Sequence, residues 1–134
     1  MKAAPIEVSI LIKAYNEEKR VARAIASACA AQAEIAPHRL EVVLADGLSE
    51  DGTVAAACMA AAHQPLRVVQ LQNARDRSCG AGWQLAYEWS SGRWVLLMDA
   101  DMTLEPGFLS KGLAHLRHHP QLAGVAAGVW DVQN

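Results

Sequence analysis

Two carboxylates, Asp99 and Asp101, stand one residue apart directly after an apolar run at residues 94–98. Alternate residues of a strand point the same way, so strand geometry carried past Asp99 would place both carboxylates on one face, roughly 6–7 Å apart. Such neighbouring anions are relieved either by protonating one of them or by binding a hard divalent cation. Because no His or Cys lies beside the pair, Mg²⁺ or Mn²⁺ shared with a phosphate substrate is favoured over Zn²⁺. Taken alone, the pair is equally compatible with one Asp capping the following turn.

The element that must position this pair is one of four short apolar runs that the sequence predicts as strands. A fifth strand is expected at residues 122–132. The alternation of strands and helices predicts an α/β fold, a mainly parallel, Rossmann-like sheet of four or five strands with helices on both faces. The four strands are expected at residues 7–14, 40–46, 66–72 and 93–99, and the helices at 17–32, 51–64, 80–92 and 105–119.

Polar segments follow the four predicted strands where the chain leaves the sheet. They read YNEE, DGLSEDGT, QNARDR and DADM in chain order. Parallel strands end at one edge of the sheet, which is where open α/β sheets bind ligands, so these segments are expected to converge there. Asn16 and Ser49 are the expected N-caps of the first two helices.

Composition restricts the classes of protein. The chain has 134 residues, 52% of them hydrophobic, and a net charge of −2, which predicts one folded domain and argues against a nucleic-acid-binding surface. No apolar run approaches the roughly 20 residues that a membrane span needs, and the apolar stretch at residues 8–12 is too short for a signal peptide. The three cysteines, Cys29, Cys58 and Cys79, are widely spaced, which indicates neither a disulfide framework nor a zinc site and fits a cytoplasmic protein.

Three of the segments occur in an order that is specific in combination. The order VSILIKAYNEE, VVLADGLSEDGT and GRWVLLMDADM resembles the motif order of family 2 glycosyltransferases, which have the GT-A fold, over residues 6–110. The resemblance implies the N-terminal, donor-binding part of such an enzyme. It implies a nucleotide-diphosphate sugar donor, most often a UDP-sugar, bound through Mg²⁺ or Mn²⁺, and transfer of the sugar to an acceptor hydroxyl with inversion.

The resemblance also implies roles for individual residues on the nucleoside side of the site. Ala14 and Tyr15 would lie against the base and ribose, and Glu17 would face the ribose. Asp46 would hydrogen-bond the base. An aromatic ring offers stacking for a flat base, and a carboxylate accepts from the imide N–H of uracil, so the chemistry is consistent with these roles.

On the diphosphate side, the resemblance implies that Arg75 or Arg77 approaches the base or the diphosphate. Asp99 would lie near the ribose or the metal, and Asp101 would bind the metal. A cation and an Arg would neutralise the charge that grows on the departing nucleoside diphosphate. Lys13 departs from the family pattern, because many relatives have Pro or another uncharged residue there.

The general base is the least defined part of the prediction. Relatives supply it from the region after the paired acids, where this chain has only Glu105 and Asp131, and Asp131 is the candidate because it ends the expected fifth strand. We therefore expect residues 1–134 to form a single GT-A-like domain truncated at its C-terminal end. In a longer protein it would act at the inner face of the membrane, and its exposed sheet edges would favour self-association.

Two other functions remain open at this point. VLLMDADMT also matches the first motif of haloacid dehalogenase-like phosphatases, in which the first Asp attacks phosphorus. That motif usually opens its fold, and the reading leaves YNEE and DGLSEDGT unexplained. The second alternative is a non-catalytic nucleotide-sugar-binding or assembly module on the same fold.

Overall fold

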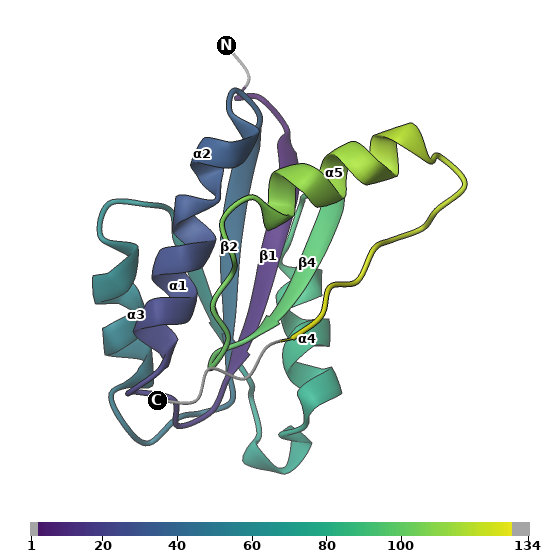
Figure 1. Ribbon diagram of the computed structural model, residues 1–134. Helices are drawn as coiled ribbons and strands as arrows, with labels where there is room; N and C mark the ends of the chain where they lie inside the picture. The colour runs from purple at the N-terminus through teal and green to yellow at the C-terminus, as the bar shows by residue number, and fades with distance from the viewer. Residues whose placement is uncertain (1–2, 130–134) are drawn as a thin grey trace.

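Four parallel strands form one sheet in the computed structural model, which describes residues 3–129 (Figure 1). The strand order is β3-β2-β1-β4, so β1 and β2 are central and β3 and β4 are edges. The prediction of a parallel α/β sheet is confirmed. The strands are β1 (Ile6–Ala14), β2 (Arg39–Asp46), β3 (Leu66–Gln70) and β4 (Trp94–Asp99).

Helices cover both faces of the sheet, as predicted. The helix α4 packs against β1, β2 and β3 on one face, while α1, α2, α3 and α5 contribute to the larger core on the other (Figure 1). The helices are α1 (Val21–Ala30), α2 (Gln32–Ile35), α3 (Thr53–Ala61), α4 (Cys79–Glu88) and α5 (Phe108–His118), with a 3₁₀ turn η1 (Ala74–Asp76). None of the helices in the described part of the chain has both the length and the apolar character needed to cross a membrane.

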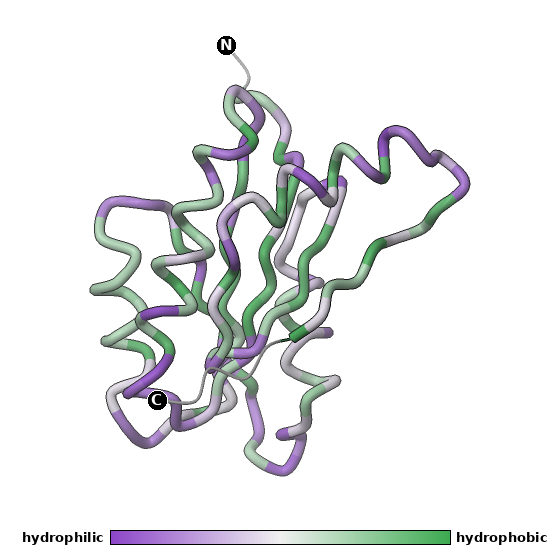
Figure 2. The backbone as a smooth tube through the Cα atoms, in the orientation of Figure 1, coloured by the Kyte–Doolittle hydropathy of each residue, from purple (hydrophilic) through white to green (hydrophobic). Residues whose placement is uncertain are grey.

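The central strand β1, which leads into the site, is packed on both faces of the sheet. Ile10 and Ile12 pack into the larger core, and Leu11 between them packs into the core under α4. All three side chains are fully buried, as expected for a strand that is covered on both faces. Figure 2 shows the apolar strands inside and hydrophilic segments at the end of the sheet where β1 and β2 finish. The polar segments therefore follow strands whose side chains are packed in the core.

The expected fifth strand is wrong for the residues that the structure describes. Residues 122–129 form no strand, and Leu122, Val125 and Val129 are exposed. The stretch alternates these residues with Ala and Gly, which have low β propensity, and it has no strand partner among residues 3–129. Asp131, the candidate base, lies outside the described residues.

The two expected helix caps are also wrong. The first helix begins at Val21 rather than after Asn16, and Asn16 has a left-handed backbone with φ of 53°. The helix α3 begins at Thr53, whose backbone N–H donates to Asp51 at 3.0 Å. Both Asn16 and Ser49 instead hydrogen-bond across to the other's loop, a long-range contact that overrides local capping.

The edge strand β4 leaves part of the sheet uncovered on the α4 side. Val95 and Leu97 are 44% and 49% exposed, because α4 lies over the other three strands. An uncovered apolar edge is a common site of association between chains. The expected self-association stays a prediction, and the exposed Val95 and Leu97 on β4 form the surface at which we expect it.

Candidate functional site

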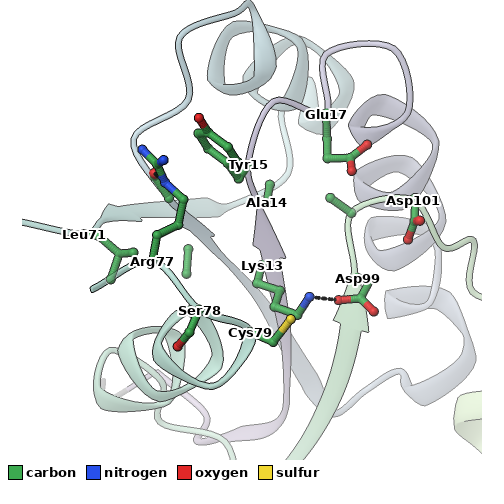
Figure 3. Close-up of a pocket in the computed structure, with 14 residues that line it drawn as sticks. Lys13, Ala14, Tyr15, Glu17, Leu71, Arg77, Ser78, Cys79, Asp99 and Asp101 are labelled. Atoms are coloured by element: carbon green, nitrogen blue, oxygen red, sulfur yellow. Dashed lines mark hydrogen bonds and ion pairs between the residues drawn. The ribbon is translucent and has the colours of Figure 1, made fainter. Parts of the chain in front are cut away.

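The loops that follow the four strands enclose a cavity of about 390 Å³ at the carboxyl ends of the strands (Figure 3). This volume lies within the range of roughly 300–1,000 Å³ that small-molecule sites occupy. The predicted convergence of the polar segments is therefore observed. The lining residues comprise six predicted site residues, Ala14, Tyr15, Glu17, Arg77, Asp99 and Asp101, together with Lys13, Ala45, Gly47, Leu71, Ser78, Cys79, Gly82 and Ala100.

The paired carboxylates reach the cavity by a different route from the one expected. The strand β4 ends at Asp99, and a turn follows in which the Met102 N–H donates to the Asp99 carbonyl oxygen at 3.0 Å. Strand alternation therefore does not extend to Asp101. Figure 3 shows Asp99 pointing toward Lys13, while Asp101 lies on the same side of the cavity as Glu17.

Asp99 forms an ion pair with Lys13 across the sheet. The two residues are register partners in the parallel β1–β4 pair, which brings their side chains together. Burial disfavours the charge on the Lys13 ammonium, but the hydrogen bond and the attraction of Asp99 outweigh it, so the pKa of Lys13 is raised. Lys13 also lies over the Trp83 ring, with Nζ 4.9 Å from the ring centroid. The ammonium is therefore charged and fixed.

Tyr15 and Arg77 form the opposite side of the cavity. The Arg77 guanidinium lies 3.7 Å from the centroid of the Tyr15 ring, and its Nε donates to the Gly47 carbonyl oxygen at 2.7 Å. The stacked pair offers a flat surface of the kind that a nucleobase packs against. Of the two candidate arginines, only Arg77 lines the cavity, because Arg75 is exposed on η1.

Asp46 lies just behind the cavity and is 1% exposed. Its carboxylate accepts hydrogen bonds from the Ser49 N–H at 3.1 Å, the Ser49 hydroxyl at 2.6 Å and the Gln70 side-chain amide at 2.9 Å. A carboxylate has about four lone-pair sites, and three are used here. Asp46 therefore holds the loop that begins at Gly47, which lines the cavity.

The first two polar segments are tied to each other. Asn16 donates its backbone N–H to the Ser49 hydroxyl and accepts from the Glu50 N–H, both at 2.9 Å. The Glu17 N–H donates to the Thr53 hydroxyl oxygen at 2.8 Å. YNEE and DGLSEDGT thus form one hydrogen-bonded unit, and this unit presents Tyr15 and Glu17 to the cavity.

The residues present fit a divalent cation that arrives with a phosphate ligand. Among residues 3–129, no group of three or more His, Cys, Asp or Glu side chains is placed to hold a metal ion by itself. Mg²⁺ is commonly bound by one or two carboxylates together with substrate phosphates. Asp101 is exposed at the cavity, and none of its side-chain atoms is hydrogen-bonded within the described chain, whereas Asp99 is held by Lys13. Asp101 thus has both carboxylate oxygens available to a cation, whereas Lys13 engages one oxygen of Asp99.

Comparison with known protein families identifies the kind of domain that contains this cavity. Residues 9–132 match glycosyl transferase family 2. The chain belongs to this family. The resemblance drawn from the three motifs is therefore confirmed, and the DADMT segment is part of a glycosyltransferase domain rather than the first motif of a phosphatase. The chain is accordingly a glycosyltransferase domain.

Individual relatives agree with this assignment. The chain is 31% identical over 103 residues to the dodecaprenyl-phosphate galacturonate synthase of Rhizobium johnstonii, covering 75% of this chain and 30% of the relative. It is 32% identical over 106 residues to the succinoglycan biosynthesis protein ExoO of Rhizobium meliloti, covering 78% and 28%. It is 28% identical over 129 residues to EpsE of Bacillus subtilis, covering 96% and 45%. The chain thus spans less than half the length of these relatives.

Solved structures support the fold. TarS of S. aureus superposes with a TM-score of 0.73 at 23% identity, over 86% of this chain and 33% of that structure. Structures of TarS in complex with UDP and with UDP-GlcNAc match with TM-scores of 0.73 and 0.72. At this level of identity the likeness shows the fold, which is that of the GT-A donor-binding region.

The sequence missed several residues that line the cavity. The sequence comparison identifies Lys13 only as a departure from the family pattern, but a charge at the end of a buried strand, on the same strand face as Leu11, itself indicates a site. Ser78 and Cys79 lie at the start of α4, where Ser78 accepts a hydrogen bond from the Ala81 N–H as N-cap. A Ser before a helical pattern is a recognised capping signal, so this helix start could have been found.

Proposed function

We propose that this chain binds a nucleotide-diphosphate sugar, with UDP-sugars as the donor class, for transfer of the sugar to an acceptor hydroxyl with inversion. The observation that carries the proposal is the cavity with the stacked Tyr15–Arg77 pair on one side and Asp101 on the other. TarS, which shares the fold, has been solved with UDP and UDP-GlcNAc, and this supports the same ligand class here.

In the proposed complex, the base lies against Tyr15 and Arg77, and Ala14 and Glu17 lie beside the ribose. Asp46 holds the neighbouring loop; its hydrogen bond to the base stays a prediction, because the carboxylate is buried and does not line the cavity. A flat, cationic surface favours a nucleobase over non-planar groups by stacking.

The diphosphate lies toward Asp101 and Lys13 in this proposal. Asp101 would hold a divalent cation, Mg²⁺ or Mn²⁺, together with the diphosphate, and the bound cation would stabilise the negative charge that develops on the leaving group. Asp99 fixes the position of Lys13 beside it. The residues of this chain thus bind and orient the donor.

For the transfer itself, an acceptor hydroxyl attacks the anomeric carbon as the bond between that carbon and the β-phosphate oxygen breaks. The hydroxyl proton passes to a general base, for which Asp131 remains the predicted candidate. The nucleoside diphosphate leaves with the electron pair of the broken bond. Attack from the face opposite the leaving group gives inversion. Action at the inner face of the membrane within a longer protein likewise stays a prediction.

Calorimetric titration of UDP, GDP and dTDP, each with Mn²⁺ and with EDTA, tests donor binding. We expect UDP to bind in the presence of Mn²⁺, and Asp101→Ala to weaken this metal-dependent binding at least about tenfold, since a hydrogen-bonded or ion-paired charge contributes about that much. Glu105→Ala is the matched control, because Glu105 is an exposed acid that does not line the cavity. Equal loss in both variants, or no UDP binding by the unaltered chain, would contradict the proposal.

A donor-binding module without transfer activity is the second candidate. It is favoured by one observation, namely that the acids lining the cavity in the described part of the chain, Glu17, Asp99 and Asp101, all have roles in donor binding in this proposal. Release of UDP from UDP-sugars in the presence of candidate acceptors separates the two. Metal-dependent UDP binding without turnover would identify the chain as the binding module, and turnover would identify it as the enzyme.

A further inference from the structure

Lys13 occupies the middle of the cavity, between its two sides (Figure 3). It is the last residue but one of the central strand β1, and its side chain is 20% exposed. Asp99 holds the ammonium from one direction and the Trp83 ring from another. An ammonium has three N–H donors, so this arrangement leaves donors available toward the cavity.

The other cation in the cavity is already engaged. Arg77 stacks on Tyr15, and its Nε donates to the Gly47 carbonyl oxygen. Its position is therefore fixed on the side assigned to the base. The charged groups that line the cavity are otherwise Lys13 and three carboxylates, those of Glu17, Asp99 and Asp101. Among the described residues that line the cavity, Lys13 is the cation that lies outside the base side, so we expect an entering diphosphate to meet it.

The packing around Lys13 brings a second anion-attracting feature to the same place. The first turn of α4, with Ser78 and Cys79, lines the cavity, and the N-terminus of a helix favours anions. This turn lies very close to β1, because a Cβ on Gly82 would stand 2.9 Å from the Lys13 Cβ. Only a residue without a side chain at position 82 permits the approach without displacement. The ammonium and the helix start are thus built side by side.

We propose that Lys13 is a diphosphate-binding residue that shares the neutralisation of the donor's charge with the divalent cation. Asp99 then acts as the residue that positions Lys13, and Asp101 is the carboxylate that binds the metal. The inference rests on the proposed function, since it concerns the same donor site. It predicts that UDP retains measurable affinity without metal, and that this affinity depends on Lys13.

NMR titrations with UDP and with uridine, in Mn²⁺-free buffer containing EDTA and again with Mg²⁺, test the inference. We expect Lys13→Met to weaken UDP binding at least about tenfold in EDTA, as expected for loss of a charged hydrogen bond, and to leave uridine binding unchanged. Lys111→Met is the matched control, because Lys111 is an exposed lysine on α5 outside the cavity. The double variant Lys13→Met/Asp99→Asn removes both charges of the ion pair and controls for an unpaired Asp99.

The outcomes separate this inference from the proposed function. Loss of UDP affinity in both Lys13 variants, with unchanged melting temperature in the double variant and retained uridine binding, supports the inference. Unchanged UDP affinity of Lys13→Met in EDTA and in Mg²⁺ overturns it while leaving the proposed function intact. The single variants Asp99→Asn and Asp101→Asn test the roles of the two carboxylates. If Asp99→Asn abolishes the gain in UDP affinity from Mg²⁺ as fully as Asp101→Asn does, Asp99 is a metal ligand, and its assignment as the residue that positions Lys13 is wrong. Absence of UDP binding by the unaltered chain overturns both.

Discussion

Replacing Asp46 tests whether this buried carboxylate holds the cavity loop. Asp46→Ala removes the acceptor of three hydrogen bonds, from the Ser49 N–H, the Ser49 hydroxyl and the Gln70 amide. Bonds to a charged acceptor contribute about 1.5–3 kcal/mol each and are not fully additive, so we expect the free energy of unfolding to fall by about 3–5 kcal/mol. Asp46→Asn keeps an oxygen that can accept from two donors, so we expect a smaller loss of about 1–2 kcal/mol.

Urea denaturation followed by tryptophan fluorescence measures both losses, because the chain has four tryptophans. Ser49→Ala is a useful intermediate, since it removes the hydroxyl and leaves the backbone donor in place; we expect a loss of about 1 kcal/mol. If Asp46→Ala is as stable as the unaltered chain, the loop is held by other contacts. A loss of UDP affinity in Asp46→Asn without any loss of stability would show that Asp46 serves the ligand and not the loop.

The remaining predictions concern pH, packing and association. Burial raises the pKa of Glu41, but the hydrogen bonds from Ser9 and Ser91 outweigh this effect, so the pKa is lowered. The stabilisation that the Glu41 carboxylate provides is therefore present above its unfolded-state pKa and is lost as the pH falls through the lowered value. Urea denaturation from pH 7 to pH 3 should show a weaker pH dependence of stability in Glu41→Gln than in the unaltered chain. Gly82→Ala should lower the melting temperature because its Cβ meets the neighbouring strand β1 at 2.9 Å, whereas Gly80→Ala in the same helix, with open space around its Cβ, should raise it; equal shifts would contradict the close packing. Sedimentation velocity should show concentration-dependent association that Leu97→Lys reduces, and an unchanged profile would remove the β4 face as the contact surface.

Much of the fold follows from local patterns in the sequence. The continuous apolar runs at β1, β2 and β4 predict buried parallel strands, and the polar segments after them predict a site at the strand ends. The same pattern predicts a strand at residues 122–129, where none forms, because hydrophobicity does not distinguish a strand from an unpaired segment rich in Ala and Gly. Strand formation also requires a neighbouring strand, and a local pattern does not report one.

The errors at the site arise from contacts between distant residues. Asn is a residue type that often caps helices, but the Asn16 side chain instead accepts a hydrogen bond from the Glu50 N–H, 34 residues further along the chain. Lys13 and Asp99 pair because of the register between β1 and β4, which depends on the whole crossover between them. Sequence reasoning can name the residue types that reach a sheet edge, but it does not give the register that decides which of them meet.

The most direct test of the central claim is a crystal structure of this chain with UDP and Mn²⁺. We expect electron density for the nucleotide in the cavity, with the uracil ring against Tyr15 and Arg77, the diphosphate within hydrogen-bonding distance of Lys13, and the metal on Asp101. Nucleotide density outside this cavity, or a diphosphate directed away from Lys13 and Asp101, would contradict it.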